Sequence, residues 1–291
     1  TADPSSITIC SGGNATFSVT ASNATAYKWQ VDQGNGLGFL DVPSGSFYSG
    51  FNTPTLIING APPTFNGYKF RAIASGSCTP AATSNVATLT VKYINIVTAQ
   101  NNILCFGSST GFATASVTGG VGAYTYSWSN GASSASISGL IAGTYTVTVS
   151  DEGGCSNTAS VTIGQPSSPL TLTAGTVTNV SCYGGANGTA EVIASGGTPG
   201  LTYSWNTSPI QSTATARGLA AGTYTVTVKD GNQCVKTLDF EISAPPALVL
   251  TQGPITHVSC KGGANGTATV IVADGKPNYS YSWNTNPVQT T

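Results

Sequence analysis

Few residues in this sequence have the type and spacing that catalysis requires. The chain contains one histidine, His257, which lies close to Cys260 in a His-x-x-Cys pattern. A single imidazole cannot build a conventional catalytic triad, and a His-Cys pair supplies only part of a tetrahedral zinc site. The equivalent position one repeat earlier is Asn179, so we expect His257 to be a solvated residue at the end of a strand.

Two glycine-rich segments also resemble chemical signatures. Residues 107–111 match the Gly-x-Ser-x-Gly pattern of a nucleophile elbow, which needs a helix after it. Residues 34–38 (Gly-Asn-Gly-Leu-Gly) would suit a phosphate cradle only if they opened a helix. No helical pattern follows either segment. We therefore expect a turn at the first and a hairpin loop at the second.

Acidic side chains occur at two equivalent turns. Asp151 and Glu152 precede Cys155, and Asp230 precedes Cys234. Carboxylate and carbonyl oxygens are calcium ligands, but each turn has few acidic groups. Aspartate also initiates turns by accepting backbone hydrogen bonds. We expect Asp-initiated turns and no cofactor, with calcium as the alternative.

Aromatic side chains are the remaining candidates for a binding platform. One tryptophan per module lies in the same strand context, which favours core positions for Trp29, Trp128, Trp205 and Trp283. Tyr145 and Tyr224 resemble a tyrosine-corner position and are expected to be structural. Six residues are left as candidate ligand residues in loops: Phe47, Tyr48 and Phe51, and the variable residue after each repeat cysteine, Phe106, Tyr183 and Lys261.

Composition excludes several classes of partner. The 291 residues carry 9 basic and 10 acidic side chains, a net charge of −1, with no cluster of Lys and Arg. Such a surface cannot attract nucleic acid by counterion release. No apolar run is long enough to span a bilayer, so we expect no membrane insertion. The 36 glycines and 15 prolines favour small, turn-rich modules.

One pattern repeats three times along the sequence. A cysteine followed by a glycine-rich turn recurs at Cys105, Cys182 and Cys260, in steps of 77 and 78 residues. The tryptophans keep the same steps, so whole modules repeat in tandem. We expect four domains: a first module over residues 1–92, a first repeat over 93–165, a second repeat over 166–244, and a truncated third repeat over 245–291.

Each repeat has the pattern of short strands. Segments rich in Val, Thr and Tyr alternate with period two between turn signals, and about six or seven such strands describe an antiparallel β-sandwich. Residues 1–92 resemble an immunoglobulin-like domain, although Phe17 stands where the first core cysteine is expected. The sequence predicts an all-β chain of tandem immunoglobulin-like antiparallel β-sandwich modules in an elongated array.

The seven cysteines suggest a disulfide framework with one residue left over. The simplest scheme gives each complete module its own disulfide: Cys10–Cys78, Cys105–Cys155 and Cys182–Cys234. Cys260 then stays unpaired, because its partner would lie beyond residue 291. Such regular cysteine positions indicate an oxidising compartment and therefore export.

Three motifs recur in the repeats: Cys-x-Gly-x-x-x-Gly, Tyr-x-Trp, and Gly-Thr-Tyr-Thr-Val-Thr-Val before an aspartate. Over about residues 95–291 they resemble the SprB repeat of gliding bacteria of the Bacteroidetes group. The pattern departs at Gln233, which replaces a glycine, and at Leu201, which replaces a tyrosine. The resemblance implies a very long cell-surface adhesin, exported by the type IX secretion system and propelled along the cell during gliding.

Two functions from different classes fit these expectations. The first is a non-enzymatic segment of a large extracellular adhesin or filament attached at the outer membrane. Its partners would be external surfaces or polysaccharides, the type IX secretion and gliding machinery, and neighbouring modules of the same chain. The alternative is the β-sandwich stalk of a secreted enzyme or carbohydrate-binding protein. Many repeats in the full-length protein would favour the filament, and a catalytic domain would favour the stalk.

Overall fold

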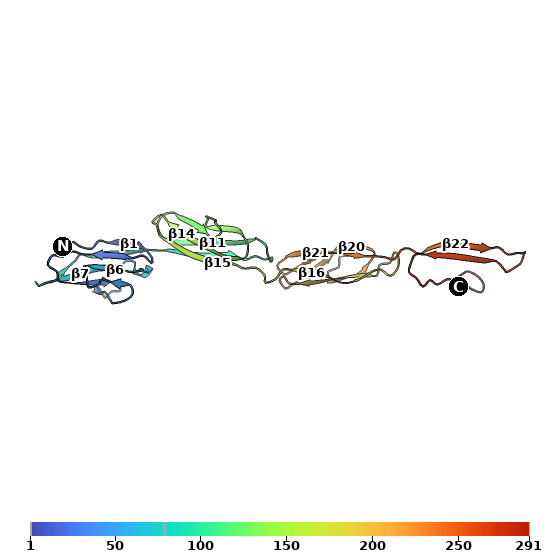
Figure 1. The fold of residues 1–291 in the computed structure, drawn as a ribbon, viewed down its shortest axis with the longest axis horizontal. Coiled ribbons are helices and arrows are strands. Elements are labelled where there is room, and N and C mark those ends of the chain that lie inside the picture. Colours follow the sequence, from blue (N-terminus) through green and yellow to red (C-terminus); the bar gives the residue numbers. More distant parts are fainter. Residues whose placement is uncertain (1, 78–79, 291) are drawn as a thin grey trace. The chain divides into compact units, whose positions relative to one another are not determined.

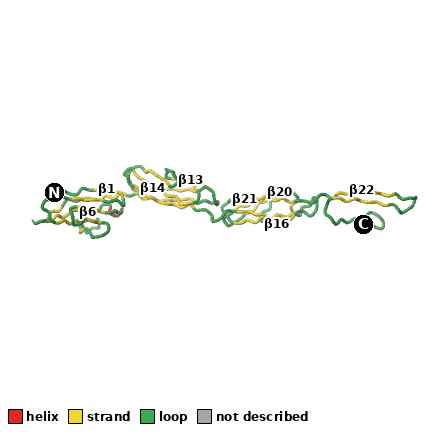
Figure 2. The backbone as a smooth tube through the Cα atoms, viewed as in Figure 1, coloured by secondary structure: helices red, strands yellow, loops and turns green. Residues whose placement is uncertain are grey.

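The computed structural model describes residues 2–77 and 80–290, which form β-strands and one short 3₁₀ helix (Figures 1 and 2). The predicted all-β class of tandem immunoglobulin-like sandwiches is confirmed. The chain divides into two compact units. The first unit contains the residues up to Ile103 and the segment Ser109–Gly164. The second contains Leu104–Ser108 and the residues from Gln165 onward.

The first module is a sandwich of two sheets. One sheet has the order β1-β9-β7-β3-β4, with β8 paired to β7, and the other has the order β2-β6-β5. β1 and β9 pair in parallel, whereas β3 and β7 are antiparallel. The elements are β1 (Ile7–Cys10), β2 (Ala15–Ser18), β3 (Ala26–Asp32), β4 (Leu40–Asp41), β5 (Tyr48–Ser49), β6 (Thr55–Ile58), the helix η1 (Pro63–Phe65), β7 (Lys69–Ser75), β8 (Ala82–Thr83) and β9 (Ala87–Lys92).

Aromatic rings join the two sheets of the first module. Phe17 on β2 stacks on Phe70 of β7 with ring centroids 5.0 Å apart, and Trp29 of β3 lies 6.4 Å from Phe17. All three side chains are buried. Phe70 follows Tyr68 with one residue between them, as the second core cysteine follows the tyrosine of an immunoglobulin domain. A phenylalanine pair therefore occupies the place of the inter-sheet disulfide.

The first and second repeats share one topology of two three-stranded sheets. In each repeat the first, second and fourth strands form one sheet, and the third, fifth and sixth form the other. The strands of the first repeat are β10 (Ile94–Asn101), β11 (Gly111–Gly119), β12 (Tyr124–Trp128), β13 (Ser136–Leu140), β14 (Gly143–Asp151) and β15 (Ser156–Ile163). Those of the second are β16 (Thr171–Thr178), β17 (Gly188–Ser195), β18 (Thr202–Trp205), β19 (Thr215–Leu219), β20 (Gly222–Lys229) and β21 (Val235–Ile242).

In these repeats, the apolar side chains at every second position of a strand form the core. Val226 and Val228 of β20 are completely buried, whereas the alternating residues Thr225 and Thr227 are only partly buried. Trp205 is 1 % exposed, and its indole N–H donates to the Thr213 carbonyl at 2.9 Å. The alternation thus directs one face of each strand into the space between the sheets.

The tyrosine-corner prediction is also confirmed. The hydroxyl of Tyr145 donates to the Ile141 carbonyl at 3.1 Å, and that of Tyr224 donates to the Ala220 carbonyl at 3.2 Å. Each bond returns to the backbone four residues upstream, as in the tyrosine corner of immunoglobulin-like sandwiches. These side chains fix the connection that leads into β14 and β20.

Replacing Trp205 by alanine is expected to destabilise the second repeat by about 3 to 5 kcal/mol, since the buried indole leaves a large cavity and an unpaired Thr213 carbonyl. Chemical denaturation of the whole chain, followed by circular dichroism, measures the change. The exposed Tyr183 is the matched control, and Tyr183→Ala should shift stability by less than about 0.5 kcal/mol. Equal effects of the two substitutions would contradict the core assignment.

The third repeat has two strands among its described residues, β22 (Val249–Thr256) and β23 (Thr267–Ala273), which pair antiparallel. They correspond to β16 and β17 of the second repeat. Trp283 is half-buried, unlike Trp29, Trp128 and Trp205. The core prediction is therefore confirmed for three tryptophans and wrong for Trp283, because residues 245–290, as described, form no second sheet over its indole.

Candidate functional site at the disulfide-linked module junctions

Disulfides join successive modules, and the predicted scheme of one disulfide within each module is wrong. Cys10 of the first module bonds to Cys155 of the first repeat, with their Cα atoms 5.3 Å apart. Cys105 of the first repeat bonds to Cys234 of the second, with a Cα separation of 5.6 Å. Cys182 and Cys260 are free and exposed. Cys78 lies outside the described residues, but its predicted partner Cys10 is bonded elsewhere.

Strand direction explains why the predicted pairs cannot form. In the second repeat Cys182 lies in the turn between β16 and β17, and this turn ends at Gly188, the first residue of β17. The side chain of Ile242, at the end of β21, packs against this same Gly188. Cys234 precedes the opposite end of β21, whose eight residues span about 26 Å. A disulfide needs Cα atoms within about 7 Å, so Cys182 and Cys234 are out of reach of each other.

The first junction is closely packed around its disulfide. Cys155 is 3 % exposed, and Cys10 packs against the same hydrophobic cluster. A cavity of about 340 Å³ lies beside the bond and is lined among others by Pro63, Lys92 and Tyr93. Cys155 is thus part of the core of the first repeat, and Cys10 of the first module packs against this core.

The second junction adds hydrogen bonds to the Cys105–Cys234 disulfide. The side-chain amide of Asn232 donates to the Leu104 carbonyl at 2.9 Å. The backbone N–H of Gly107 donates to the side-chain oxygen of Gln165 at 2.9 Å. These contacts hold Leu104–Ser108, a segment of the first repeat, within the second compact unit. Sequence reasoning missed Asn232 and Gln165, since neither has a counterpart of the same type in the other repeat.

Two aspartates, Asp151 and Asp230, stabilise the turns that lead to Cys155 and Cys234, the second cysteine of each repeat. Asp230 is 1 % exposed and its carboxylate accepts backbone hydrogen bonds from Thr198, Asn232 and Cys234, each at 2.9 Å. Asp151 accepts the equivalent bonds from Val121 and Cys155, both at 2.8 Å. The predicted Asp-initiated turns are confirmed. The carboxylates bridge two loops and orient the backbone of the bonded cysteine.

Hydrogen bonding sets the charge state of Asp230. The N–H of Thr198, and then those of Cys234 and Asn232, lower the pKa of its carboxyl below the ordinary 3.8, against the opposing effect of burial. Since the folded pKa is the lower one, ionised Asp230 stabilises the fold above the ordinary value. This contribution is lost as the pH falls through the folded pKa.

Asp230→Ala is expected to lower the melting temperature of the second repeat by about 4 to 8 °C at neutral pH, because three backbone N–H groups lose their acceptor. Asp239→Ala, at an exposed position, is the control. Scanning calorimetry at pH 7 and pH 3 measures both. The difference between wild type and Asp230→Ala should shrink at the lower pH, and a difference that grows there would contradict the assigned role.

The two glycine-rich segments and His257 lie in turns and loops. Residues 107–111 lead into strand β11, and residues 34–38 connect β3 to β4, as predicted. His257 is exposed directly after the end of β22, also as predicted. Within the described residues no group of three or more His, Cys, Asp or Glu side chains gathers where it could hold a metal ion.

The candidate ligand residues of the first module divide into two kinds. Tyr48 and Phe51 pack in or against the core, and Tyr48 stacks on Phe65 with centroids 5.7 Å apart. Burial raises the pKa of the Tyr48 hydroxyl to about 12. Phe47 is 41 % exposed and meets Phe65 edge-on. Of these three predicted residues, Phe47 is the one that presents its ring to solvent.

The candidate residues after Cys105, Cys182 and Cys260 differ in their surroundings, because Cys105 is bonded and the other two cysteines are free. Phe106 lines a 240 Å³ cavity with Pro166, Pro169, Leu170 and Val235. Tyr183 is 69 % exposed, and Lys261 is also exposed. The structure therefore brings Phe106 into a module junction, while Tyr183 and Lys261 extend from the two turns whose cysteines are free.

Comparison with protein families agrees with the repeated geometry. The sequence model of the SprB repeat matches residues 97–133, 174–209 and 253–288. The chain carries three tandem SprB repeats. Each match covers the first half of a repeat, from its first strand past its tryptophan, and leaves the hairpins β14–β15 and β20–β21 outside. SprB repeats and immunoglobulin-like tandem folds are typically non-catalytic structural modules. No curated protein sequence matches the chain.

Solved structures with a similar fold contain tandem immunoglobulin domains. The N-terminal eight immunoglobulin domains of Down Syndrome Cell Adhesion Molecule align with 84 % of this chain at 14 % identity and a TM-score of 0.46. This chain covers 36 % of that fragment. The titin I-band fragment I67–I69 aligns with 83 % of this chain and 96 % of its own length at 13 % identity, with a TM-score of 0.37. Drosophila OTK domains 3–5 give 12 % identity, coverage of 83 % and 95 %, and a TM-score of 0.29.

The disulfides and the SprB repeats also bear on where the protein resides. Disulfides persist in oxidising compartments outside the cytosol, so both features indicate an extracellular protein. Among the described residues, none belongs to a helix of the length and apolarity needed to span a bilayer.

Proposed function

We propose that the chain is a non-enzymatic repeat segment of a large secreted cell-surface adhesin or filament that serves surface attachment and gliding. The observation that carries this proposal is the covalent linkage of successive modules by Cys10–Cys155 and Cys105–Cys234. Each bond bypasses the peptide connection between neighbouring modules, so tension passes from module to module through a disulfide. In a chain that is pulled against a surface, such connections shorten the covalent path that bears the load. The SprB repeats suggest the same class of protein.

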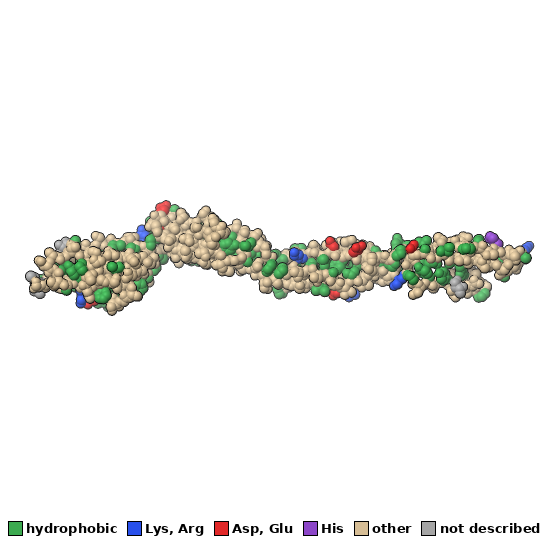
Figure 3. Space-filling view, in the orientation of Figure 1, with side chains coloured by type: hydrophobic (Ala, Val, Ile, Leu, Met, Phe, Trp, Pro, Cys, Tyr) green, Lys and Arg blue, Asp and Glu red, His purple; other side chains and the backbone are tan. Residues whose placement is uncertain are grey.

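The surface composition supports work outside the cell. Charged residues make up 7 % of the chain, and Figure 3 shows few Lys, Arg, Asp and Glu side chains on the visible face. Contacts made through Thr, Ser and Asn are little affected by ionic strength, because screening acts on charges. External surfaces or polysaccharides are the proposed partners, with weak contacts multiplied by the repeats. The proposal also includes export of the protein by the type IX secretion system, its attachment at the outer membrane and its movement by the gliding machinery.

Imaging of living source cells tests the proposed function. Fluorescent antibody fragments raised against residues 95–244 are expected to label the cell surface and to move along the cell during gliding. Cells from which the protein has been deleted provide the control for labelling. Label that stays fixed, or that is found only in the medium, would contradict a gliding adhesin and favour the stalk of a secreted enzyme or carbohydrate-binding protein.

A further inference from the structure

We propose that the cavity beside the Cys10–Cys155 disulfide is a binding site for a hexuronate, a sugar whose ring carries one carboxylate, as a unit of an acidic polysaccharide. The cavity measures about 340 Å³, which lies within the range of small-molecule sites, roughly 300 to 1,000 Å³. The inference deepens the proposed function and rests on its choice of polysaccharides as partners. It names the class of sugar and the residues that contact it.

Most of the residues that line this cavity have polar side chains, and the first module and the first repeat both contribute them. They are Ser11, Lys92, Tyr93, Asn95, Ser156 and Asn157. Hydroxyl and amide groups donate and accept hydrogen bonds, as the hydroxyls of a sugar do. The side-chain amide of Asn157 donates one hydrogen to the Ile94 carbonyl at 2.8 Å, so its second N–H is available to a ligand.

Lys92 supplies the positive charge of the cavity. Its side chain is half-buried and forms no ion pair with another described residue. None of the described residues that line the cavity is acidic. The carboxylate of Asp151, which lies near Cys155, already accepts the backbone N–H groups of Val121 and Cys155, both at 2.8 Å. The Lys92 ammonium can therefore pair with the carboxylate of a ligand, and hydrogen bonds between charged groups are stronger than those between neutral groups.

Tyr93 and Pro63 supply the apolar part of the lining. The side chain of Tyr93 is 48 % exposed, and Pro63 is the first residue of η1. A tyrosine ring has an apolar body and a polar hydroxyl, so it can contact both the C–H groups and the hydroxyls of a sugar ring. The cavity thus combines one cation, several neutral hydrogen-bonding groups and an aromatic ring, which together match a hexuronate.

Hydrogen bonds fix the connection between β9 and β10, which forms one wall of the cavity. The Lys92 carbonyl accepts the N–H of Ser11 at 2.8 Å, and the Tyr93 carbonyl accepts the N–H of Gly120 at 2.9 Å. The next carbonyl, that of Ile94, accepts the side-chain bond from β15. Three consecutive carbonyls are thus held, from both modules of the same compact unit. A site that is formed before the ligand arrives loses less conformational entropy on binding.

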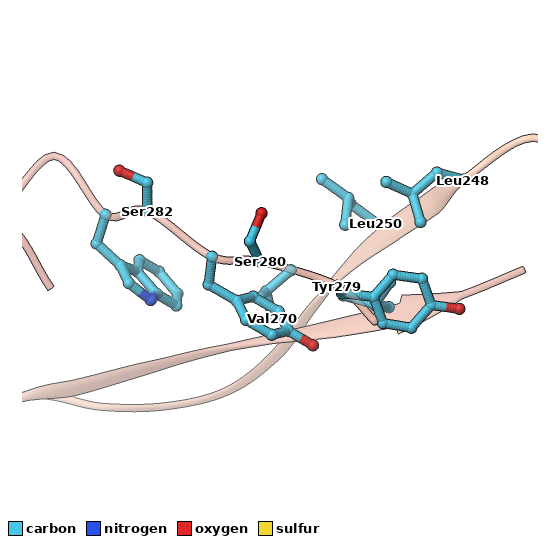
Figure 4. Close-up of a pocket in the computed structure, with 9 residues that line it drawn as sticks. Leu248, Leu250, Val270, Tyr279, Ser280 and Ser282 are labelled. Carbon is cyan, nitrogen blue, oxygen red and sulfur yellow. The ribbon is translucent and has the colours of Figure 1, made fainter. Parts of the chain in front are cut away.

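A cavity of similar size in the third repeat lacks these features (Figure 4). It measures about 310 Å³, and Figure 4 shows Leu248, Leu250 and Tyr279 among its lining. None of the described residues that line it carries a charge. A carboxylate that entered it would lose water without gaining an ion pair, which is unfavourable. The charge of the ligand therefore distinguishes the two cavities.

Titration of the 291-residue chain with D-glucuronate, followed by nuclear magnetic resonance, tests the proposal. D-glucose is the matched control ligand, because it has a CH₂OH group in place of the carboxylate. We expect glucuronate to bind with a dissociation constant in the millimolar range and glucose to bind at least about tenfold more weakly, because it lacks the charge-assisted hydrogen bond. Sodium acetate, which offers the carboxylate without the ring, should also bind at least about tenfold more weakly than glucuronate.

Three variants assign the binding to this cavity. Lys92→Gln is expected to remove the preference, so that glucuronate binds as weakly as glucose. Lys69→Gln removes an exposed lysine of the same module that does not line the cavity, and it should bind glucuronate as the wild type does. Ser11→Trp places a large ring in the cavity and should abolish the binding of both sugars. Melting temperatures show whether each variant is folded, and Lys92→Gln decides if Ser11→Trp is not.

Any of four results would overturn the proposal. The wild type could show no saturable binding of glucuronate, or it could bind glucose equally well. Acetate that binds as tightly as glucuronate would show that the sugar ring is not recognised. Wild-type affinity in Lys92→Gln, or in folded Ser11→Trp, would place the ligand outside this cavity. The titration uses the purified chain, so it can fail while labelled protein moves along living cells, and imaging can fail while the cavity binds glucuronate.

Discussion

A tryptic digest of the denatured, non-reduced chain is expected to leave residues 1–28 covalently attached to residues 93–217. Trypsin cleaves after Lys28, Lys69 and Lys92, so Cys10 and Cys78 fall into separate peptides, and Cys155 falls into the peptide 93–217. The Cys10–Cys155 bond holds 1–28 to 93–217, and the Cys105–Cys234 bond adds residues 230–236 to the same product. Free thiols are alkylated before unfolding to prevent exchange, and the masses are measured before and after reduction.

The two disulfide schemes predict different masses in this digest. Pairing within modules would attach residues 1–28 to residues 72–92, and finding that product would reject the junction disulfides. Cys155→Ser provides the matched control, because it should release residues 1–28 and leave residues 93–217 attached to 230–236. The effect is all-or-none, and it requires neither a partner nor knowledge of the function.

Single-molecule stretching is expected to show a fully unfolded chain of about 400 Å when the disulfides are intact and about 1,000 Å under reducing conditions. The shortest covalent route from one end to the other runs from Cys10 to Cys155, back along the chain to Cys105, and across to Cys234. This route contains about 120 residues, at about 3.4 Å each. The stretch from residue 11 to residue 104 therefore carries no load while both bonds last.

Single substitutions distinguish this route from one through disulfides within modules, which would give a similar total length. Cys182→Ser should leave the extension unchanged, because Cys182 is free in the structure. Cys155→Ser should lengthen it to about 550 Å, because the load then follows the peptide chain as far as Cys105. An extension that increases in Cys182→Ser would refute the junction scheme.

Local patterns in the sequence were enough to predict the modules. Period-two alternation in segments such as residues 222–229 predicts strands whatever lies around them, because successive side chains point to opposite faces. Repeated spacing of cysteine and tryptophan predicts tandem copies. The Asp230 turn was equally predictable, because an aspartate accepts hydrogen bonds from the backbone that directly follows it. Each of these features depends on neighbours in the chain.

The disulfide pairing depended on the tertiary structure. Between Cys182 and Cys234 lie four strands, and an even number of alternating hairpin strands would return the chain to the end at which it started. β17 and β20 start at the same end of the repeat, because Ile242, the partner of Gly222 at the start of β20, packs against Gly188 at the start of β17. β19 is antiparallel to β17 and β18 is antiparallel to β20, so β18 and β19 run in the same direction, in different sheets. Cys234 is thereby placed at the opposite end of the repeat from Cys182, where a cysteine of the preceding repeat reaches it. The sequence by itself determined the strands, the turns and the tandem modules, whereas only the tertiary structure decided which cysteines meet, since that depends on strand direction across two sheets.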